Sequence, residues 1–223
     1  MKFAYGSSDF QRIIVNNMFY VDRTHLIPAI EDAGDQIIFL RPRRFGKSLW
    51  LSTLENYYDI AKADQFDALF GALAIGKHPT PLHNHYLIMR WDFSLVGVTG
   101  GADDIEQRLH EHINERIAKV AHKYAQQLSI PVTITQHNAI ASFESLVTAV
   151  DDASLKLYLL IDEYDNFAND VMMGDSDTHY ETLLHGEGVV RTVFKAVKGA
   201  ASGMGLERVF ITGVSPIAMS DIT

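Results

Sequence analysis

The residues best suited to chemistry are a glycine, a lysine and a serine in succession, Gly46-Lys47-Ser48. They follow an apolar run, Ile37–Leu40, and precede a segment, Leu49–Asp59, that suits a helix. A strand, a turn ending in Gly-Lys-Ser and a helix make the layout of a phosphate-binding loop, or P-loop. The glycine lets the backbone approach a phosphate, while the lysine charge and the helix dipole attract it. We therefore predict a nucleotide site here.

The loop departs from the common pattern, because Arg41 stands where a glycine is usual, five residues before Gly46. With Arg43 and Arg44 it crowds guanidinium groups into one turn. Either these groups add donors around a polyphosphate, or they form a solvated basic turn that does not bind phosphate. The role of Arg41 stays open. The expected nucleotide contacts are Arg43, Arg44, Phe45, Gly46, Lys47, Ser48 and Leu49.

A second stretch carries two adjacent carboxylates at the end of an apolar run, Leu157–Ile161. Such a run is typical of a strand buried on both faces. An acid at the end of that strand, far along the chain from a P-loop, suits the magnesium side of a nucleotidase. We expect Asp162 and the Ser48 hydroxyl to hold Mg²⁺, and Glu163 to polarise the attacking water. A structural cap or a divalent site of another kind is the alternative.

The last predicted strand, Arg208–Thr212, ends in a polar residue. Nucleotidases use a polar group there to bind the γ-phosphate or the lytic water, so Thr212 is the catalytic candidate and Ser215 the runner-up. A turn residue that satisfies local backbone is the alternative reading. Arg191 could sense phosphate, although an ordinary surface arginine is the better interpretation.

Composition narrows the classes of function. The chain has 223 residues, 47% of them hydrophobic, and a formal net charge of −9. We therefore expect a buried core and no general affinity for nucleic acid. The chain contains no cysteine, which excludes disulfides, thiol catalysis and zinc–thiolate sites. It also has no signal peptide and no apolar run of about 18 residues, so we expect a cytoplasmic protein without a membrane span.

Hydrophobic spacing predicts the other elements. Asp9 should cap a first helix, Thr24 a second and Asn138 another, and Asp92 should cap a turn. The predicted helices are 10–15, 25–33, 64–70, 103–128, 139–151 and 189–197, and the predicted strands are 37–40, 86–93, 157–161 and 208–212. Residues 71–84 are predicted to be a loop, and residues 164–188 a surface loop or a partly ordered lid.

With these motifs, the chain resembles the predicted bacterial and archaeal AAA-ATPase-like family over nearly its whole length. In that family the arginine-rich P-loop lacks the first glycine, so Arg41 is a family trait. One departure is Arg23, where a lysine is more usual. The matching stretches are Phe10 with Tyr20–Thr24, Arg41–Ser48, Asp92-Phe93-Ser94, Asp162-Glu163-Tyr164-Asp165 and Thr212-Gly213-Val214-Ser215.

The resemblance implies an α/β fold: a three-layer P-loop NTPase of the ASCE type, with a parallel sheet and helices on both faces. The P-loop strand should lie between the Thr212 strand and another neighbour. We expect a single P-loop domain over residues 1–223, in which residues 1–35 form an N-terminal collar. Family members usually continue into a C-terminal domain similar to PD-(D/E)XK nucleases. The chain is therefore expected to stop before a final strand, a lid and this effector.

The leading hypothesis is a domain that binds ATP and hydrolyses it with Mg²⁺, coupled to the nuclease-like effector. A homo-oligomer is a second partner that we consider. A guanine nucleotide is disfavoured because no Asn-Lys-x-Asp element appears. One alternative is a nucleotide-gated switch with little turnover, and another is a small-molecule kinase. A degenerate scaffold that binds no nucleotide is a further alternative.

Overall fold

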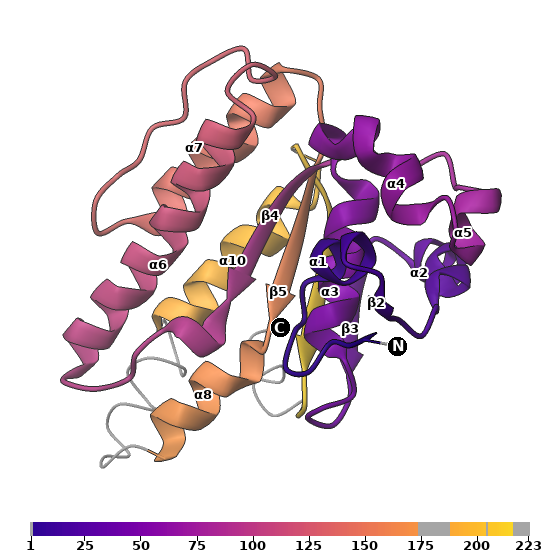
Figure 1. Cartoon of the computed structure of the whole chain (residues 1–223). Coiled ribbons are helices and arrows are strands. Elements are labelled where there is room, and N and C mark those ends of the chain that lie inside the picture. The colour runs from indigo at the N-terminus through magenta and orange to yellow at the C-terminus, as the bar shows by residue number, and fades with distance from the viewer. Residues whose placement is uncertain (1, 174–187, 204, 216–223) are drawn as a thin grey trace.

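The structure is a computed structural model that describes residues 2–173, 188–203 and 205–215. Its centre is a four-stranded parallel sheet in the order β3-β6-β5-β4 (Figure 1). The strands are β3 (Gln36–Leu40), β4 (Leu87–Asp92), β5 (Leu157–Asp162) and β6 (Leu206–Gly213). Because parallel strands end at the same edge, the register places Leu40 beside Gly213 and Asp92 beside Asp162 at that edge.

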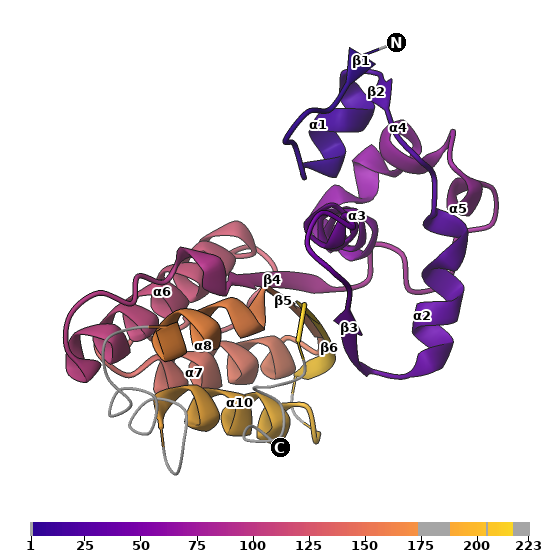
Figure 2. The ribbon, with the colours of Figure 1, turned by 90° about the horizontal axis from the view of Figure 1, so that it is seen from below.

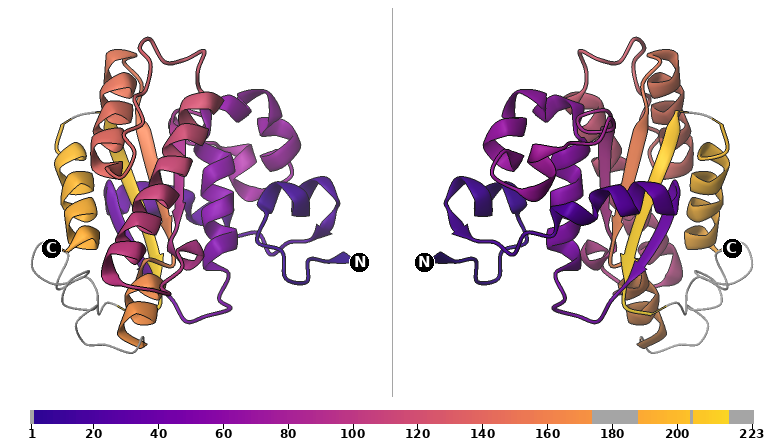
Figure 3. Two further views of the ribbon diagram at one scale, coloured as in Figure 1. Left: turned by 90° about the vertical axis from the view of Figure 1, so that its left-hand side faces the viewer. Right: turned by 90° about the vertical axis from the view of Figure 1, so that its right-hand side faces the viewer.

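Helices cover both faces of the sheet (Figures 2 and 3). One face carries α6 (Ala102–Lys123), α7 (Ala139–Asp152) and α10 (Val189–Ala200), whose apolar side chains pack with those of the strands in one core cluster. The other face carries α3 (Lys47–Tyr58), which packs on Ile88, Leu160 and Phe210. Every residue of β5 is buried, as its apolar run predicts. The predicted three-layer α/β fold with a parallel sheet is therefore confirmed.

The first helix of the N-terminal segment, α1 (Phe10–Val15), packs on α3 and on α4 (Phe66–Phe70) rather than on the sheet (Figure 2). Phe10 is fully buried there and stacks on Phe70 with ring centroids 4.9 Å apart. The elements on this side are β1 (Lys2–Phe3), α1 (Phe10–Val15), β2 (Met18–Phe19), η1 (Thr24–Leu26), α2 (Ile27–Ala33), η2 (Ile60–Gln65), α4 (Phe66–Phe70) and α5 (Ala74–Lys77). At the carboxyl edge of the sheet lie η3 (Phe93–Leu95) and α8 (Tyr164–Met173).

Most of the predicted caps are confirmed. Asp9 accepts a hydrogen bond of 2.9 Å from the Arg12 amide, and Asn138 accepts one of 3.0 Å from the Ala141 amide. Asp92 accepts hydrogen bonds from both the amide and the hydroxyl of Ser94. In each case a short polar side chain supplies the acceptor that a helix or turn start requires.

The predicted cap at Thr24 is wrong. The Thr24 hydroxyl donates to Asp22 at 2.7 Å and accepts from the Ile75 amide at 3.1 Å, so it ties the N-terminal segment to α5. Thr24 begins a 3₁₀ turn, and α2 starts only at Ile27. The predicted loop over residues 71–84 also contains α5, because Ile75 is buried and anchors a single helical turn.

The end of the longest helix and the structure after Glu163 differ from their predictions. The long helix α6 ends at Lys123 rather than at Leu128, although Tyr124 and Leu128 continue the apolar spacing. Tyr124 lies directly after the helix, yet its side chain is buried and its hydroxyl donates to Asp59 at 2.8 Å. A buried position thus continues the apolar spacing without continuing the helix. Residues 164–173 form α8 and not a loop, since Tyr164 and Phe167 are buried on the adjoining structure. Residues 174–187 of the predicted lid lie outside the described residues.

The predicted place of the P-loop strand is half right. β3 pairs with β6, the strand that carries Thr212. Among the described strands β3 has no second neighbour, because β1 and β2 pair with each other. Within the same described ranges, no helix is both long and apolar enough to cross a membrane.

Candidate nucleotide-binding site

The P-loop connects the end of β3 to the start of α3. The Arg41 amide donates a hydrogen bond of 3.1 Å to the Gly213 carbonyl, so the loop is tied to the end of β6. Two residues of the loop adopt left-handed backbone angles, Arg44 with φ of 67° and Gly46 with φ of 79°. Glycine adopts this conformation freely, whereas a non-glycine residue bears a cost of roughly 1–2 kcal/mol. The loop therefore adopts a defined and slightly strained turn immediately before α3.

The N-terminus of α3 can bind an anion. The first hydrogen bond of this 12-residue helix runs from the Trp50 amide to the Gly46 carbonyl at 2.9 Å. The amides of Lys47, Ser48 and Leu49 therefore have no partner within the helix and point from its positive end. Backbone amides and a helix dipole in this arrangement favour phosphate.

Lys47 is held inside the loop. Only 5% of its surface is exposed, and Nζ donates to the carbonyls of Arg41 at 3.0 Å and Pro42 at 3.3 Å. These bonds hold the ammonium against the backbone of the loop. Burial raises the pKa of Glu163 and the charge of Lys47 opposes that rise, so the two groups act on each other electrostatically.

The arginines of the loop take different directions. The Arg41 guanidinium lies over the Phe39 ring, 5.0 Å from its centroid, and donates to the Leu40 carbonyl. Arg41 therefore turns back along β3. Nη2 of Arg43 donates to Oδ1 of Asn166 on α8 at 3.4 Å, so this arginine spans from the loop to the acid side. Arg44 is exposed.

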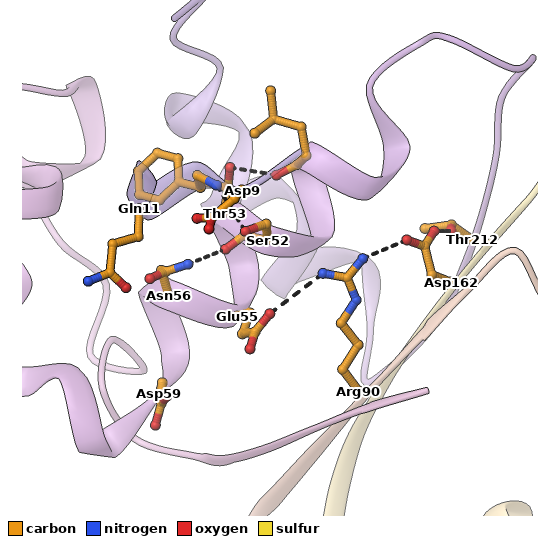
Figure 4. Close-up of polar contacts among 12 residues, drawn as sticks. Asp9, Gln11, Ser52, Thr53, Glu55, Asn56, Asp59, Arg90, Asp162 and Thr212 are labelled. Atoms are coloured by element: carbon orange, nitrogen blue, oxygen red, sulfur yellow. Dashed lines mark hydrogen bonds and ion pairs between the residues drawn. The ribbon is translucent and has the colours of Figure 1, made fainter. Parts of the chain in front are cut away.

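The predicted acid and the predicted polar residue of the last strand lie together. Asp162 is 1% exposed, and its Oδ1 accepts a hydrogen bond of 2.7 Å from the Thr212 hydroxyl (Figure 4). The same hydroxyl oxygen accepts from the Glu163 amide at 3.4 Å. Because side chains alternate along a strand, Asp162 and Thr212 share the sheet face of Leu160 and Phe210, which is the face that α3 covers. Both residues therefore face the helix that the P-loop opens.

Glu163 occupies an unusual backbone position directly after β5. Its φ of 50° is left-handed, a conformation that is uncommon outside glycine and concentrated at functional sites. Burial raises the pKa of its carboxyl, and the charges of Asp162 and Asp92 raise it further. Lys47 and Arg43 oppose this shift. The carboxylate thus has an affinity for protons above that of an ordinary glutamate, which suits a general base.

The oxygens available here fit magnesium. The Ser48 hydroxyl lies in the first turn of α3, and the Asp162 carboxylate lies at the end of β5. Among the described residues, no group of three or more His, Cys, Asp or Glu side chains could cage a metal ion. Mg²⁺ is usually held by one or two protein oxygens together with water and substrate phosphates, so this donor set matches that ion.

A pocket of about 690 Å³ opens beside the P-loop. Its lining joins Phe45, Gly46 and Trp50 to Tyr20 and Ile30 of the N-terminal collar. Most of that lining is apolar, and its volume suits a small organic ligand. No local pattern in the sequence predicts this pocket, because its walls come from segments that meet only after folding.

Two candidates take other places. Arg191 lies on α10, whose buried side chains belong to the core on the sheet face opposite α3. The Ser215 amide donates to Oδ2 of Asp165 at 2.7 Å, as the Val214 amide does at 2.8 Å. Asp165 therefore fixes the turn after β6, and Ser215 is held there through its backbone.

Sequence reasoning missed Arg90. This residue lies on β4, and its Nη2 donates to Oδ2 of Asp162 at 2.7 Å. A signal for it was present, because Arg90 is the one basic residue in the apolar run from Leu87 to Trp91. A charge inside a buried strand normally has a partner, and here that partner is the acid of the next strand.

Comparison with known proteins assigns the chain to a family. The family described as "Predicted AAA-ATPase" matches residues 4–223. A protein of Azotobacter chroococcum mcd 1, described as "Uncharacterized protein in vnfD 5'region", is 28% identical over 153 residues. That stretch is 67% of this chain and 26% of the relative, which is therefore much the longer protein. No solved structure matches the chain. Since the family match covers nearly every residue, the chain belongs to the predicted AAA-ATPase family.

Proposed function

We propose that this chain binds ATP with Mg²⁺ and hydrolyses it. One observation carries the proposal: the start of α3 with Lys47 and the acids at the end of β5 meet at one edge of the sheet, with Thr212 between the strand ends. A triphosphate on the helix amides would extend toward the acids. Family membership supports a nucleotidase independently of this geometry.

Each residue has a chemical role in the proposal. The amides of Lys47, Ser48 and Leu49 and the Lys47 ammonium bind the β- and γ-phosphates. Ser48 and Asp162 would hold the metal, directly or through water, and magnesium would neutralise charge on the phosphate oxygens. Glu163 orients the attacking water and accepts its proton.

Thr212 has a positioning role in the same proposal. Its hydroxyl holds Asp162 and accepts from the Glu163 amide, so both acids keep their orientation relative to the phosphates. Arg43 and Arg44 supply further donors near the phosphates, while Arg41 lies along β3.

The pocket beside the loop supports a nucleotide rather than free phosphate as the ligand. Gly46 belongs both to its lining and to the start of α3, so a nucleoside in the pocket would be contiguous with phosphates on the helix amides. Phe45 and Trp50 offer aromatic surface to a base. The described lining residues include no carboxylate to accept the N–H groups of guanine, which favours adenine.

A nucleotide-gated switch is the second candidate. It is favoured by the contact between Arg43 and Asn166, which joins the P-loop to α8 and could transmit the state of the bound phosphate. Under either reading the output passes to an effector domain beyond this domain, and a homo-oligomer could complete the site. Both partners are part of the proposal.

Glu163→Gln distinguishes these functions. If the chain is an ATPase, the substitution keeps ATP binding and lowers phosphate release by about 10²- to 10⁴-fold, the usual contribution of a general base. The exposed Glu144 on α7 supplies a matched control, Glu144→Gln, which should release phosphate at the wild-type rate. Binding without release in all three proteins would indicate a switch. Transfer of phosphate to an added small-molecule acceptor would indicate a kinase.

A further inference from the structure

A second basic side chain lies at the acids, and the roles proposed above do not use it. Arg90 extends from β4 between the sheet and α3 (Figure 4). Its Nη2 lies 2.7 Å from Oδ2 of Asp162, and its Nη1 lies 3.7 Å from Oε2 of Glu55 on α3. Arg90 therefore connects the candidate metal-side acid to the middle of the P-loop helix.

Burial explains why Asp162 has such a partner. The side chain of Asp162 is 2% exposed, and a carboxylate so buried requires a counter-charge or several hydrogen bonds. Thr212 supplies one hydrogen bond at Oδ1, and Arg90 supplies a charged one at Oδ2. Both carboxylate oxygens are thus engaged before any metal is considered.

Arg90 and a divalent cation would compete for this carboxylate. Both are attracted to the same oxygen lone pairs, and two positive charges that contact one carboxylate repel each other strongly in a partly buried site. The arginine side chain can yield, because it is 26% exposed and Glu55 offers it a second acceptor, itself 31% exposed. The contact at 3.7 Å is longer than a charged hydrogen bond, so it can shorten when Arg90 leaves Asp162.

We propose that Arg90 is the exchangeable counter-cation of Asp162, and that it transfers to Glu55 when magnesium and nucleotide bind. The inference rests on the proposed function, since it needs a metal at Asp162. Arg90 acts as a positioning residue and contacts neither phosphate nor water. The exchange would have two consequences. The charge of Arg90 on β4 would set the magnesium concentration that the site requires, and metal binding would strengthen the contact between Arg90 and Glu55 on α3.

Thermal unfolding tests the exchange without relying on catalysis. The protein is titrated with Mg²⁺ in the presence of a non-hydrolysable ATP analogue, and the Mg²⁺ concentration at half of the Tm increase is recorded. In Arg90→Met the metal meets no competing charge, so this concentration should fall by about tenfold or more. Arg90→Lys keeps the charge and should stay within about threefold of the wild type. Without metal, Arg90→Met should have a lower Tm, because Asp162 has lost its counter-charge.

Glu55→Gln provides a test in the opposite direction. The substitution removes the negative charge that attracts Arg90 to this position and leaves only a neutral amide oxygen, so the magnesium requirement should rise. Because Glu55 is part-exposed, this variant should fold even if Arg90→Met does not. Unchanged requirements in both Arg90→Met and Glu55→Gln, or a higher requirement in Arg90→Met, would overturn the exchange while leaving nucleotide binding in place. No Tm increase with the analogue in the wild type would overturn the proposed function, and the exchange with it.

Discussion

Oγ1 of Thr212 donates a hydrogen bond of 2.7 Å to Oδ1 of Asp162, which joins the ends of β6 and β5. Both residues are buried, and the same hydroxyl oxygen accepts from the Glu163 amide. One hydroxyl thus orients the two acids assigned to the metal and to the water. The strand ends are joined by these hydrogen bonds, so a substitution at Thr212 should change the orientation of both Asp162 and Glu163.

Thr212→Val removes this hydroxyl while keeping the side-chain shape. Phosphate release should fall by up to about 100-fold, the effect of small misplacements of catalytic groups. The free energy of unfolding should fall by about 1–3 kcal/mol, because buried Asp162 loses a hydrogen-bond partner. Thr212→Ser is the matched control and should retain most of both properties. Wild-type turnover in Thr212→Val would remove Thr212 from the mechanism.

Tryptophan fluorescence can locate the adenine base of bound ATP. The chain has 2 tryptophans: Trp50 lines the pocket beside the P-loop, and Trp91 is buried in the core on the other face of the sheet. ATP should therefore change the emission of wild type and of Trp91→Phe, but not that of Trp50→Phe. Inorganic triphosphate, which lacks a base, should give little change. A response that persists in Trp50→Phe would place the base elsewhere.

Gly213 is predicted to tolerate no side chain. A Cβ atom there would lie 2.4 Å from Cε1 of Tyr164, and the Gly213 carbonyl accepts from the Arg41 amide of the P-loop. Gly213→Ala should lower the free energy of unfolding by about 1–3 kcal/mol, the usual cost of overpacking, and should weaken ATP binding. Chemical denaturation measures the first effect. The double variant Gly213→Ala, Tyr164→Ala should lose less free energy of unfolding than the sum of the losses in the two single variants, because Tyr164→Ala removes the clashing ring. Full additivity would argue against the clash.

His112 should make the fold sensitive to acid. Burial and the charge of Arg116 lower the pKa of His112, against the opposing charges of Asp92 and Glu115. The folded state thus favours the neutral ring, while the ring in the unfolded chain has a pKa of about 6.5. This contribution to stability is complete above that pH and is lost as the pH falls toward the lower folded pKa. His112→Gln should therefore show a smaller loss of stability between pH 7 and pH 5 than wild type, or than His122→Gln on the exposed side of α6.

The P-loop and the acid strand could be predicted because their signals are local. Five apolar residues before Asp162 indicate a buried strand, and Gly46-Lys47-Ser48 after an apolar run indicates the start of a helix. Strand polarity then brings both to one edge of the sheet. The contact between Asp162 and Thr212 follows from two strand ends that lie side by side.

Other features depend on contacts between distant segments. The exchange partners of Arg90 come from α3 and β5, and the pocket of Trp50 needs the N-terminal collar folded against the loop. Spacing also misplaced the end of α6, because Tyr124 satisfies the apolar pattern from a position after the helix. The polar composition after Glu163 concealed α8, which buries Phe167. In each case tertiary packing determined the outcome.

Equilibrium binding of ATP with Mg²⁺ to the wild type, Lys47→Ala and Lys119→Ala tests the central claim most directly. Lys47 is enclosed by the P-loop, whereas Lys119 pairs with Glu115 on the exposed side of α6 and serves as the matched loss of one positive charge. We predict that Lys47→Ala raises the Kd for ATP by about 10- to 100-fold, the value of a charged hydrogen bond, while Lys119→Ala leaves it unchanged. Equal affinity in all three proteins, or no binding by the wild type, would contradict a nucleotide site at this loop.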